Sequence, residues 1–274
     1  MGFGQFWQFR CGALHPIADH VDVTLAVADS WLVEDGKIRS LERHFERFVA
    51  GCLAQGVIQS RSDLPFDSFF DQCLALIPVA GRWFPRLEYH FGERDPLFFR
   101  LREAPEQTRE LSLWVLDAAD PRVNPAVKGP DLSLGMQLRR KAQLHGADEA
   151  LLLDERGHLI EGALSSIVWW RGNQFFAPNH ETRWLPSVTR EEVMEIARQS
   201  GFEVLETSAS ILELEGCELW SLSSLQGIRR VSKLMLDDER ILELAPVTGE
   251  SDSRLNSFQM RLRMLATLPS SKNE

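Results

Sequence analysis

The sequence predicts an α+β protein with two domains, built from mixed and antiparallel sheets with flanking helices. A chain of 274 residues, of which 44% are hydrophobic, is long enough to bury two ordinary cores. Segments with helical periodicity alternate with short runs of β-branched and aromatic residues, as is typical of this fold class. The proline-rich stretch AADPRVNPAVKGPD interrupts regular structure. We therefore place an N-terminal domain at 1–118, a connection at 119–127 and a C-terminal domain at 128–274.

The N-terminal domain is expected to contain a hairpin, two helices and three further strands. Residues 21–39 are rich in strand formers and contain the turn dipeptide Asp35-Gly36, which favours a hairpin. Apolar residues in 41–56 recur at intervals of three and four, as on one face of an amphipathic helix. A second helix is expected over 62–77. The three strands should follow at 82–91, 97–103 and 110–117.

The C-terminal domain begins with a helix and two consecutive hairpins. The helix is expected at 132–146, where Gly146 is a plausible C-terminal stop. The hairpins at 149–162 and 165–177 imply antiparallel sheet. A capped helix should occupy 187–201. The remaining elements are strands at 202–206, 217–223 and 227–231 and a last helix within 250–267.

Charge and motif content exclude several classes of function. A net charge of −10 and a pI near 5.3 oppose a broad surface for nucleic acid or anionic membranes, so a small-molecule partner is expected. The four cysteines lack the spacing of a zinc site or a disulfide framework, and no metal is expected. Dinucleotide, NTPase, zinc-protease and hydrolase motifs do not occur. Without a long apolar run, the chain is expected to be soluble and cytoplasmic.

Lys128 is unusual because of where it lies in the chain. It is one of five lysines, and Pro125, Gly129 and Pro130 surround it. A lysine is used in catalysis when partial desolvation lowers the pKa of its ammonium group, which frees the amine to form a Schiff base with a carbonyl. An exposed loop lysine is the simpler interpretation of this residue alone. The stretch that follows Lys128 favours the catalytic one.

The segment from Gly146 to Val204 closely resembles the pattern of class IV aminotransferases, which are pyridoxal-phosphate enzymes of fold type IV. A strand GADEALLLD, a turn and strand HLIEG, and a helix start LPSVTR occur in the family's order. Lys128 precedes Glu149 by 21 residues and Glu161 by 33, which suits the family's spacing. The resemblance therefore implies the two-domain fold type IV and a site for pyridoxal 5'-phosphate.

The resemblance also implies a role for each matching residue. Lys128 would hold the cofactor through a Schiff base and then move the proton of the substrate α-carbon. Glu161 would lie against the pyridine nitrogen and keep it protonated. The cofactor phosphate would meet the start of a helix and further donors. These phosphate-binding candidates are Ser187, Val188, Thr189, Arg47 of the His44-Phe45-Glu46-Arg47 motif, Ser223 and Ser224.

Substrate contacts are expected in the N-terminal domain. Arg86 and Tyr89 lie in a segment resembling the family's arginine-containing strand, and an arginine there could pair with a carboxylate. Asp29 and Ser30 replace residues that usually face the substrate. After Lys128, Asp131-Leu132-Ser133 stands where aminotransferases often have asparagine and tyrosine, and Ser166 replaces another usual asparagine.

Three functions remain open at this point. Amino-group transfer on an amino acid or an amino-bearing carboxylate is the first. Elimination of pyruvate from aminodeoxychorismate, as the lyase of the same family performs it, is the second, because the tyrosine after Lys128 is missing. A degenerate member that binds the cofactor without turnover is the third. The resemblance also implies a homodimer.

Overall fold

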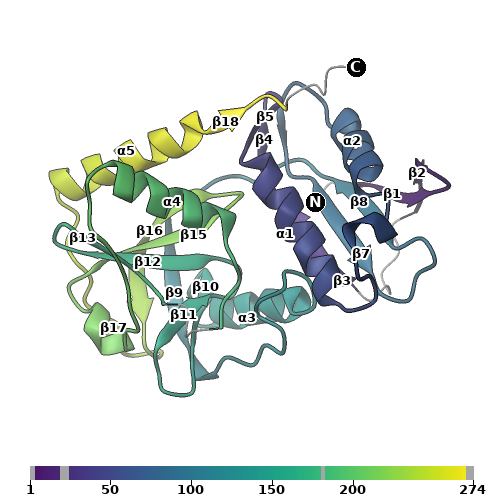
Figure 1. Ribbon diagram of the computed structural model, residues 1–274. Helices are drawn as coiled ribbons and strands as arrows, with labels where there is room; N and C mark the ends of the chain where they lie inside the picture. The colour runs from purple at the N-terminus through teal and green to yellow at the C-terminus, as the bar shows by residue number, and fades with distance from the viewer. Residues whose placement is uncertain (1–3, 19–24, 180–182, 270–274) are drawn as a thin grey trace. The chain divides into compact units, whose positions relative to one another are not determined.

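The computed structural model describes residues 4–18, 25–179 and 183–269, and its chain divides into two compact units (Figure 1). Unit 1 consists of Met1–Glu106, Val127–Pro130 and Met264–Glu274, and unit 2 consists of Gln107–Ala126 and Asp131–Arg263. Within the described ranges, no helix combines the length and apolar character needed to cross a membrane.

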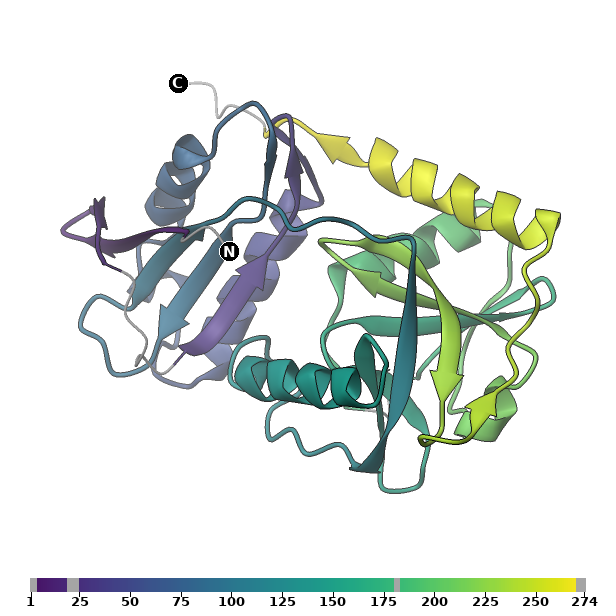
Figure 2. The ribbon, with the colours of Figure 1, turned by 180° about the vertical axis from the view of Figure 1, so that it is seen from behind.

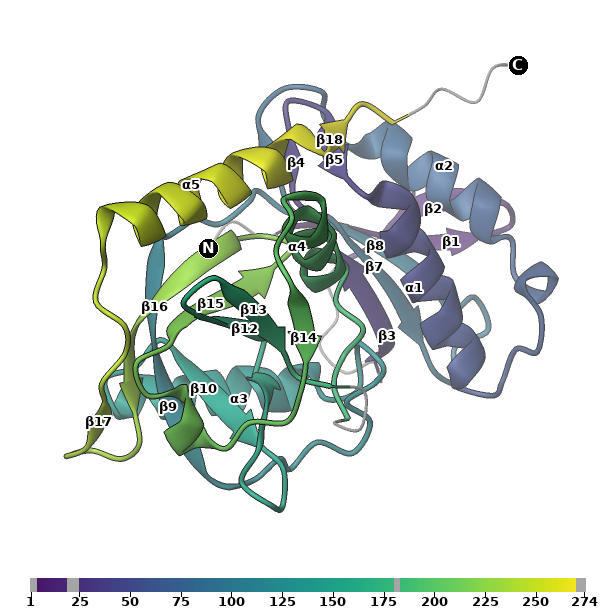
Figure 3. The same ribbon diagram turned by 60° about the vertical axis from the view of Figure 1, so that its left-hand side comes forward.

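The main sheet of unit 1 has five antiparallel strands in the order β2-β1-β8-β7-β3. Their bounds are β1 Gln5–Arg10, β2 Ala13–Pro16, β3 Leu25–Ser30, β7 Arg86–His90 and β8 Leu97–Leu101. Helices α1 (Leu41–Ala54) and α2 (Phe66–Leu76) cover one face of this sheet (Figure 3). Alternate strand residues such as Leu87 and Phe99 enter the core there with Phe48 and Phe69 of the helices.

The turn predicted from Asp35-Gly36 lies in a second, small sheet of unit 1. It has the order β18-β5-β4-β6, with β4 Val33–Glu34, β5 Lys37–Arg39, β6 Arg82–Trp83 and β18 Ala266–Thr267. Asp35 and Gly36 connect β4 to β5 with positive φ angles of 48° and 75°, as a two-residue hairpin turn requires. The expected hairpin at 21–39 is therefore confined to its second half, and residues 21–24 lie outside the described ones.

The second predicted helix begins later than expected. A short 3-10 turn, η1 (Arg61–Asp63), precedes it, and Ser60 caps this turn by accepting a hydrogen bond from the Ser62 backbone N–H. Leu64 is extended and α2 starts directly after Pro65. The reason is that the residue before a proline is disfavoured in helical conformation, so one continuous helix cannot form there.

Unit 2 contains a nine-stranded mixed sheet. The order is β11-β10-β9-β16-β15-β12-β13-β14, with β17 paired to β16. β9 runs parallel to both β10 and β16 (Figure 2), whereas the two predicted hairpins are antiparallel. The strand bounds are β9 Glu110–Ala119, β10 Glu149–Leu153, β11 Leu159–Gly162, β12 Ser166–Arg171, β13 Gln174–Ala177, β14 Val204–Glu206, β15 Glu218–Ser223, β16 Gly227–Met235 and β17 Ile241–Leu242.

Helices and apolar clusters cover the sheet of unit 2. The helices are α3 (Leu132–Leu144), α4 (Val188–Gln199) and α5 (Gly249–Met264), and η2 (Ile211–Leu214) is a 3-10 turn. One cluster joins α4 and α5 to β12 and β15 around Trp170 and Trp220, and another places α3 against β9 and β10. Three of the four cysteines are buried free thiols, while Cys11 is exposed.

The division into units differs from the boundaries drawn on the sequence. The segment 107–118 belongs to unit 2, because β9 is hydrogen-bonded between β10 and β16 in its sheet. Lys128 belongs to unit 1, because Val127–Pro130 returns to β3. The chain therefore passes from unit 2 to unit 1 after Ala126 and returns to unit 2 after Pro130.

Candidate active site

Lys128 is held against the edge strand of the unit 1 sheet. Its carbonyl oxygen accepts a 2.7 Å hydrogen bond from the N–H of Ala28 in β3. Gly129 has a φ of +151°, and a Cβ there would lie 2.6 Å from both the Ala26 oxygen and the Val27 Cα. Only glycine allows this close approach. The hydrogen bond to Ala28 and the close approach of Gly129 thus hold the Lys128 backbone against β3.

Glu161 of β11 is 4% exposed, and one of its carboxylate oxygens accepts hydrogen bonds. Its Oε1 accepts hydrogen bonds from Nη1 of Arg122 at 2.6 Å and from the N–H of Leu185 at 3.0 Å. Its Oε2 accepts none from the residues that the structure describes. Burial raises the pKa of Glu161, while the positive charge of Arg122 opposes that rise. One carboxylate oxygen therefore remains available to a further donor.

Arg122 is a functional candidate that the sequence reasoning missed. It lies in the proline-rich connection, and its guanidinium joins two carboxylates. Nε and Nη2 donate to Asp120 at 2.8–3.0 Å, and Nη1 donates to Glu161. Burial would lower the pKa of Arg122, but Asp120 and Glu161 outweigh it and raise the pKa. The only signal in the sequence was an arginine in a segment without regular structure.

The N-terminus of α4 lies beside Glu161. Ser187 is the N-cap, and its hydroxyl accepts a 3.2 Å hydrogen bond from the Arg190 N–H. The N–H groups of Val188 and Thr189 lie in the first turn, where helix geometry provides no acceptor. The Thr189 hydroxyl is buried and has no hydrogen-bond partner among the described residues. Because Leu185 is bonded to Glu161, this helix start and the carboxylate are neighbours.

Arg190 follows these residues and was not assigned a role from the sequence. It is 2% exposed, and its guanidinium carbon lies 3.2 Å from the ring centre of Trp184. Burial lowers its pKa, although nearby carboxylates including Glu161 oppose this. A cation stacked on an indole beside the start of α4 adds positive potential where the helix dipole is already positive.

Asp29 and Arg47 form a buried ion pair in unit 1. Asp29 of β3 is completely buried, and its two oxygens accept from Nε and Nη2 of Arg47 at 2.7 and 2.8 Å. Nδ1 of His44 lies 2.8 Å from the same carboxylate. Burial opposes ionisation of Asp29, but Arg47 and His44 hold its pKa well below the usual value. Arg47, a predicted phosphate ligand, is therefore hydrogen-bonded directly to Asp29, a predicted substrate contact.

Arg86 and Ser30 lie opposite each other on neighbouring strands of the same sheet. Arg86 pairs with the buried Glu88, which also accepts a 3.0 Å hydrogen bond from Nε of Arg100. Tyr89 lies on the other face of β7, 3% exposed, inside the apolar core of unit 1. Arg86 and Tyr89 therefore face opposite sides of the sheet.

The remaining predicted residues lie at turns of unit 2. Ser223 ends β15, and its hydroxyl accepts from the N–H of Gln226, while Ser224 follows in the turn to β16. The Asp131 carboxylate accepts from the backbone N–H groups of Val123 and Asn124. Asp131 thus stabilises the turn that precedes Lys128.

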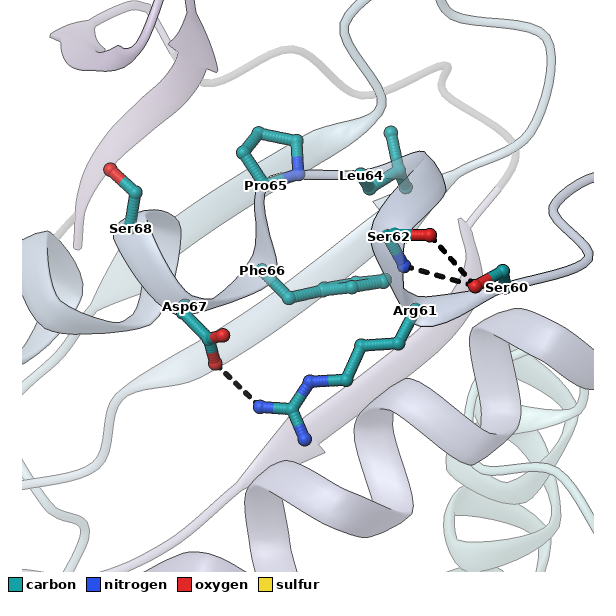
Figure 4. A pocket seen from close by; sticks show the side chains of 8 residues that line it. All are labelled: Ser60, Arg61, Ser62, Leu64, Pro65, Phe66, Asp67 and Ser68. Carbon is teal, nitrogen blue, oxygen red and sulfur yellow. Dashed lines mark hydrogen bonds and ion pairs between the residues drawn. The ribbon is translucent and has the colours of Figure 1, made fainter.

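A hollow of about 420 Å³ lies elsewhere in unit 1, around η1 and the start of α2 (Figure 4). Arg61 and Asp67 form an exposed ion pair in it, and Ser60 contacts Ser62. It contains none of the predicted site residues. Most of the predicted residues instead lie in two places. In unit 1, Lys128, Asp29, Ser30, Arg47 and Arg86 lie on or beside β3 and β7, with the Asp29–Arg47 pair and the Ser30–Arg86 pair on opposite faces of the sheet. In unit 2, Glu161 lies beside residues 187–189.

The chain is similar to known proteins in sequence and in fold. Residues 26–234 match the family model described as amino-transferase class IV. A putative branched-chain-amino-acid aminotransferase of Methanocaldococcus jannaschii is 30% identical over 92 residues, which is 34% of this chain and 32% of that relative. The chain thus spans about a third of the length of this curated relative.

Two solved structures illustrate the likeness in fold. A branched-chain amino acid aminotransferase of Thermobaculum terrenum in its PLP form has a TM-score of 0.76 at 17% identity, over 96% of this chain and 97% of that one. A putative 4-amino-4-deoxychorismate lyase of Legionella pneumophila has a TM-score of 0.73 at 20% identity, over 90% and 96%.

A fold IV transaminase of Curtobacterium pusillum has a TM-score of 0.74 at 18% identity, over 96% of this chain and 98% of that one. These likenesses confirm the predicted α+β architecture and fold type IV. The match to the family model covers most of the chain, from β3 to β16. It contains Lys128, Glu161 and the start of α4, the residues on which the predicted site depends. The protein therefore belongs to the class IV aminotransferase family.

Proposed function

We propose that the protein is a pyridoxal-phosphate-dependent enzyme that transfers an amino group from an amino acid or an amino-bearing carboxylate. One observation carries the proposal. One carboxylate oxygen of Glu161 accepts no hydrogen bond from the described residues, and the other accepts one from the N–H of Leu185, just before α4. In the first turn of α4, the buried Thr189 hydroxyl has no hydrogen-bond partner among the described residues. A pyridinium N–H and a phosphate on one ring fit these two sites, because they need an acceptor and donors respectively.

The residues of unit 2 would hold the cofactor. The N–H groups of Val188 and Thr189, the Thr189 hydroxyl and Ser187 would bind the phosphate, as Ser223 and Ser224 would from their turn. Arg122 would keep Glu161 ionised, so that the carboxylate accepts a hydrogen bond from the pyridinium N–H rather than carrying a proton of its own. Pyridoxal phosphate, when bound, withdraws electrons from the substrate α-carbon and makes its proton removable.

The residues of unit 1 would supply the base and the substrate contacts. Lys128 would carry the cofactor and then move a proton at the substrate α-carbon through Nζ, and the tight turn at Gly129 keeps its backbone in place. Arg86 would take a substrate carboxylate beside Ser30. Arg47, oriented by Asp29, would add a further phosphate contact.

Elimination of pyruvate from aminodeoxychorismate is the second candidate reaction. The observation in its favour is the segment after Lys128. There the Asp131 carboxylate accepts hydrogen bonds from backbone N–H groups of the preceding turn, and no tyrosine follows. A tyrosine that some aminotransferases place against the cofactor is therefore missing. The substrate would still be a small amino-bearing carboxylate.

A direct assay separates these reactions. Purified protein with added pyridoxal phosphate is incubated with branched-chain amino acids, D-alanine or aminodeoxychorismate. Formation of keto acid and of the aminated cofactor supports transfer, whereas formation of 4-aminobenzoate and pyruvate supports the lyase. Cofactor binding without any product would show a degenerate member and contradict the proposed activity. We also propose that the protein is cytoplasmic and forms a homodimer. Sedimentation of the purified chain would test the homodimer.

A further inference from the structure

The turn between β15 and β16, residues 223–227, contains donors that no described residue uses. The Ser223 hydroxyl accepts the N–H of Gln226 at 3.2 Å, and its own O–H donates to none of the described residues. The N–H of Leu225 also has no acceptor within the described chain. A hydroxyl and a backbone N–H that the protein leaves unused can both donate to a phosphate.

Two glutamine side chains connect this turn to the segment before β9. Oε1 of Gln226 accepts the N–H of Thr108 at 2.9 Å, and the side-chain amide of Gln107 donates to the Leu225 carbonyl. Residues 107 and 108 directly precede β9, which pairs with β16. The 223–227 turn is therefore hydrogen-bonded to a segment that lies 118 positions earlier in the chain.

A third glutamine, Gln259 of α5, contacts the end of the same turn. Its Oε1 accepts the N–H of Ile228 at 3.0 Å. Gly227 has a φ of +67°, and a Cβ there would lie 3.1 Å from both polar atoms of the Gln259 side-chain amide. The glycine therefore allows the turn backbone and α5 to approach closely. Gln259 holds the point at which β16 begins.

These attachments come from segments near the places where the chain passes between the two units. Unit 1 ends at Glu106, and unit 2 begins at Gln107. Gln259 lies about one helical turn before Arg263, where unit 2 ends. A turn held from both segments has little conformational freedom before a ligand arrives. Less entropy is then lost when the ligand binds, which raises the affinity.

We propose that Gln107, Gln226 and Gln259 are positioning residues, which hold the 223–227 turn in the form that binds the cofactor phosphate. They act through the turn backbone and Ser223 rather than on the phosphate itself. The word cofactor rests on the proposed function, whereas the holding of a phosphate-binding turn does not. Because the turn serves the phosphate alone, the glutamines affect a ligand that has a phosphate and not the same ligand without it.

Titration of the full chain with pyridoxal phosphate and with pyridoxal tests the proposal, because these two aldehydes differ only in the phosphate. Gln259→Met keeps the length of the side chain but lacks the acceptor for Ile228. It should weaken pyridoxal phosphate binding about five- to tenfold, the effect of roughly one hydrogen bond, and leave pyridoxal binding unchanged. Gln226→Met, which lacks the acceptor for Thr108, should do the same. Gln174→Met is the matched control, since Gln174 bonds the exposed Glu203 side chain, and it changes neither.

Hydrogen exchange followed by mass spectrometry gives a second readout, which needs no cofactor. In the protein without added cofactor, Gln259→Met should exchange faster than the wild type in the peptide that covers 223–228, because the Ile228 N–H loses its acceptor. The peptide that covers the start of α4 should exchange at the same rate in both proteins. Equal exchange in the 223–228 peptide would contradict the role of Gln259.

The binding results separate the inference from the proposed function. Unchanged pyridoxal phosphate binding in Gln259→Met, or equal weakening of both aldehydes, would overturn the inference and leave the proposed function standing. If Gln259→Met does not fold, Gln226→Met decides by the same comparison. If the wild-type protein binds inorganic phosphate but neither aldehyde, and Gln259→Met weakens phosphate binding, the proposed function fails and the positioning role stands. A wild-type protein that binds none of the three probes would contradict both.

Discussion

Replacing Arg122 by methionine should destabilise the protein through the charges that it leaves behind. Its guanidinium makes four side-chain hydrogen bonds, three to Asp120 and one to Glu161, and all three side chains are at most 10% exposed. Removal of one partner from a buried ion pair typically costs about 3–5 kcal/mol, because the other charge stays buried without compensation. We expect a loss in that range in the free energy of unfolding at pH 8.

The loss should also depend on pH. Burial already raises the pKa of Glu161, and removal of Arg122 takes away the main interaction that opposes this rise. A carboxyl group whose pKa is higher in the folded than in the unfolded protein costs stability above its unfolded pKa, and protonation relieves that cost as the pH falls. The destabilisation by Arg122→Met should therefore be smaller at pH 5 than at pH 8.

Urea unfolding at the two pH values measures both effects. The double variant Arg122→Met with Glu161→Gln should recover part of the loss at pH 8, because the buried charge at position 161 is gone. Lys141→Met is the control, since Lys141 forms an exposed ion pair with Asp117. A loss in Arg122→Met no larger than in Lys141→Met, or the same loss at pH 5 and pH 8, would refute the argument that Arg122 compensates Glu161.

Three further predictions concern single residues. Thr189→Val should weaken pyridoxal phosphate binding about tenfold or more in a spectroscopic titration, with little change in stability, because the lost hydroxyl has no partner within the described chain. Gly129→Ala should cost about 1–3 kcal/mol in urea unfolding and lower cofactor loading, since a Cβ would contact β3 at 2.6 Å. The Glu88 pKa of about 2, against a usual 4.5, reflects the His90 hydrogen bond and nearby arginines outweighing burial. It provides roughly 3 kcal/mol above pH 4.5 that is lost as the pH falls through 2.

Each of these has a control and an opposing outcome. Thr189→Ser keeps the hydroxyl and should bind cofactor normally, so equal weakening in both variants would count against a phosphate contact. Gly157→Ala alters a glycine at positive φ with open space around it, and an equal loss of cofactor there would show that Gly129 has no special position. Glu88→Gln should lose less stability between pH 4.5 and 2 than the wild-type protein, because only the contribution of Glu88 is removed. An unchanged pH profile would contradict the assignment to Glu88.

The fold was predictable where the information is local. α1 follows from apolar residues on one face, and the β4–β5 turn from Asp35-Gly36. β1 and β18 were not predicted. β1 forms a local hairpin with β2, but both β1 and β18 also pair with strands far away in the sequence. β1 pairs with β8, whose residues follow it by about ninety positions, and β18 pairs with β5. A periodic pattern does not reveal such pairing.

The candidate site was likewise predictable only in part. Lys128, Glu161 and Ser187 to Thr189 follow from a motif with fixed spacing, and their roles stay predictions. The partners of these residues depend on sheet register and on a connection without regular structure. Arg122 meets Glu161 across 39 positions, and Arg100 lies opposite Arg86 only because β7 and β8 pair in one register. No sequence pattern specifies those contacts in advance.

Peptide mapping after borohydride reduction shows whether Lys128 is the residue that carries the cofactor. The protein is loaded with pyridoxal phosphate, reduced, digested and analysed by mass spectrometry, with Lys128→Ala and Lys141→Ala in parallel. We expect one phosphopyridoxyl group per chain on the peptide that contains Lys128, its loss in Lys128→Ala and its retention in Lys141→Ala. An unlabelled protein, or a label on another lysine that persists in Lys128→Ala, would contradict it.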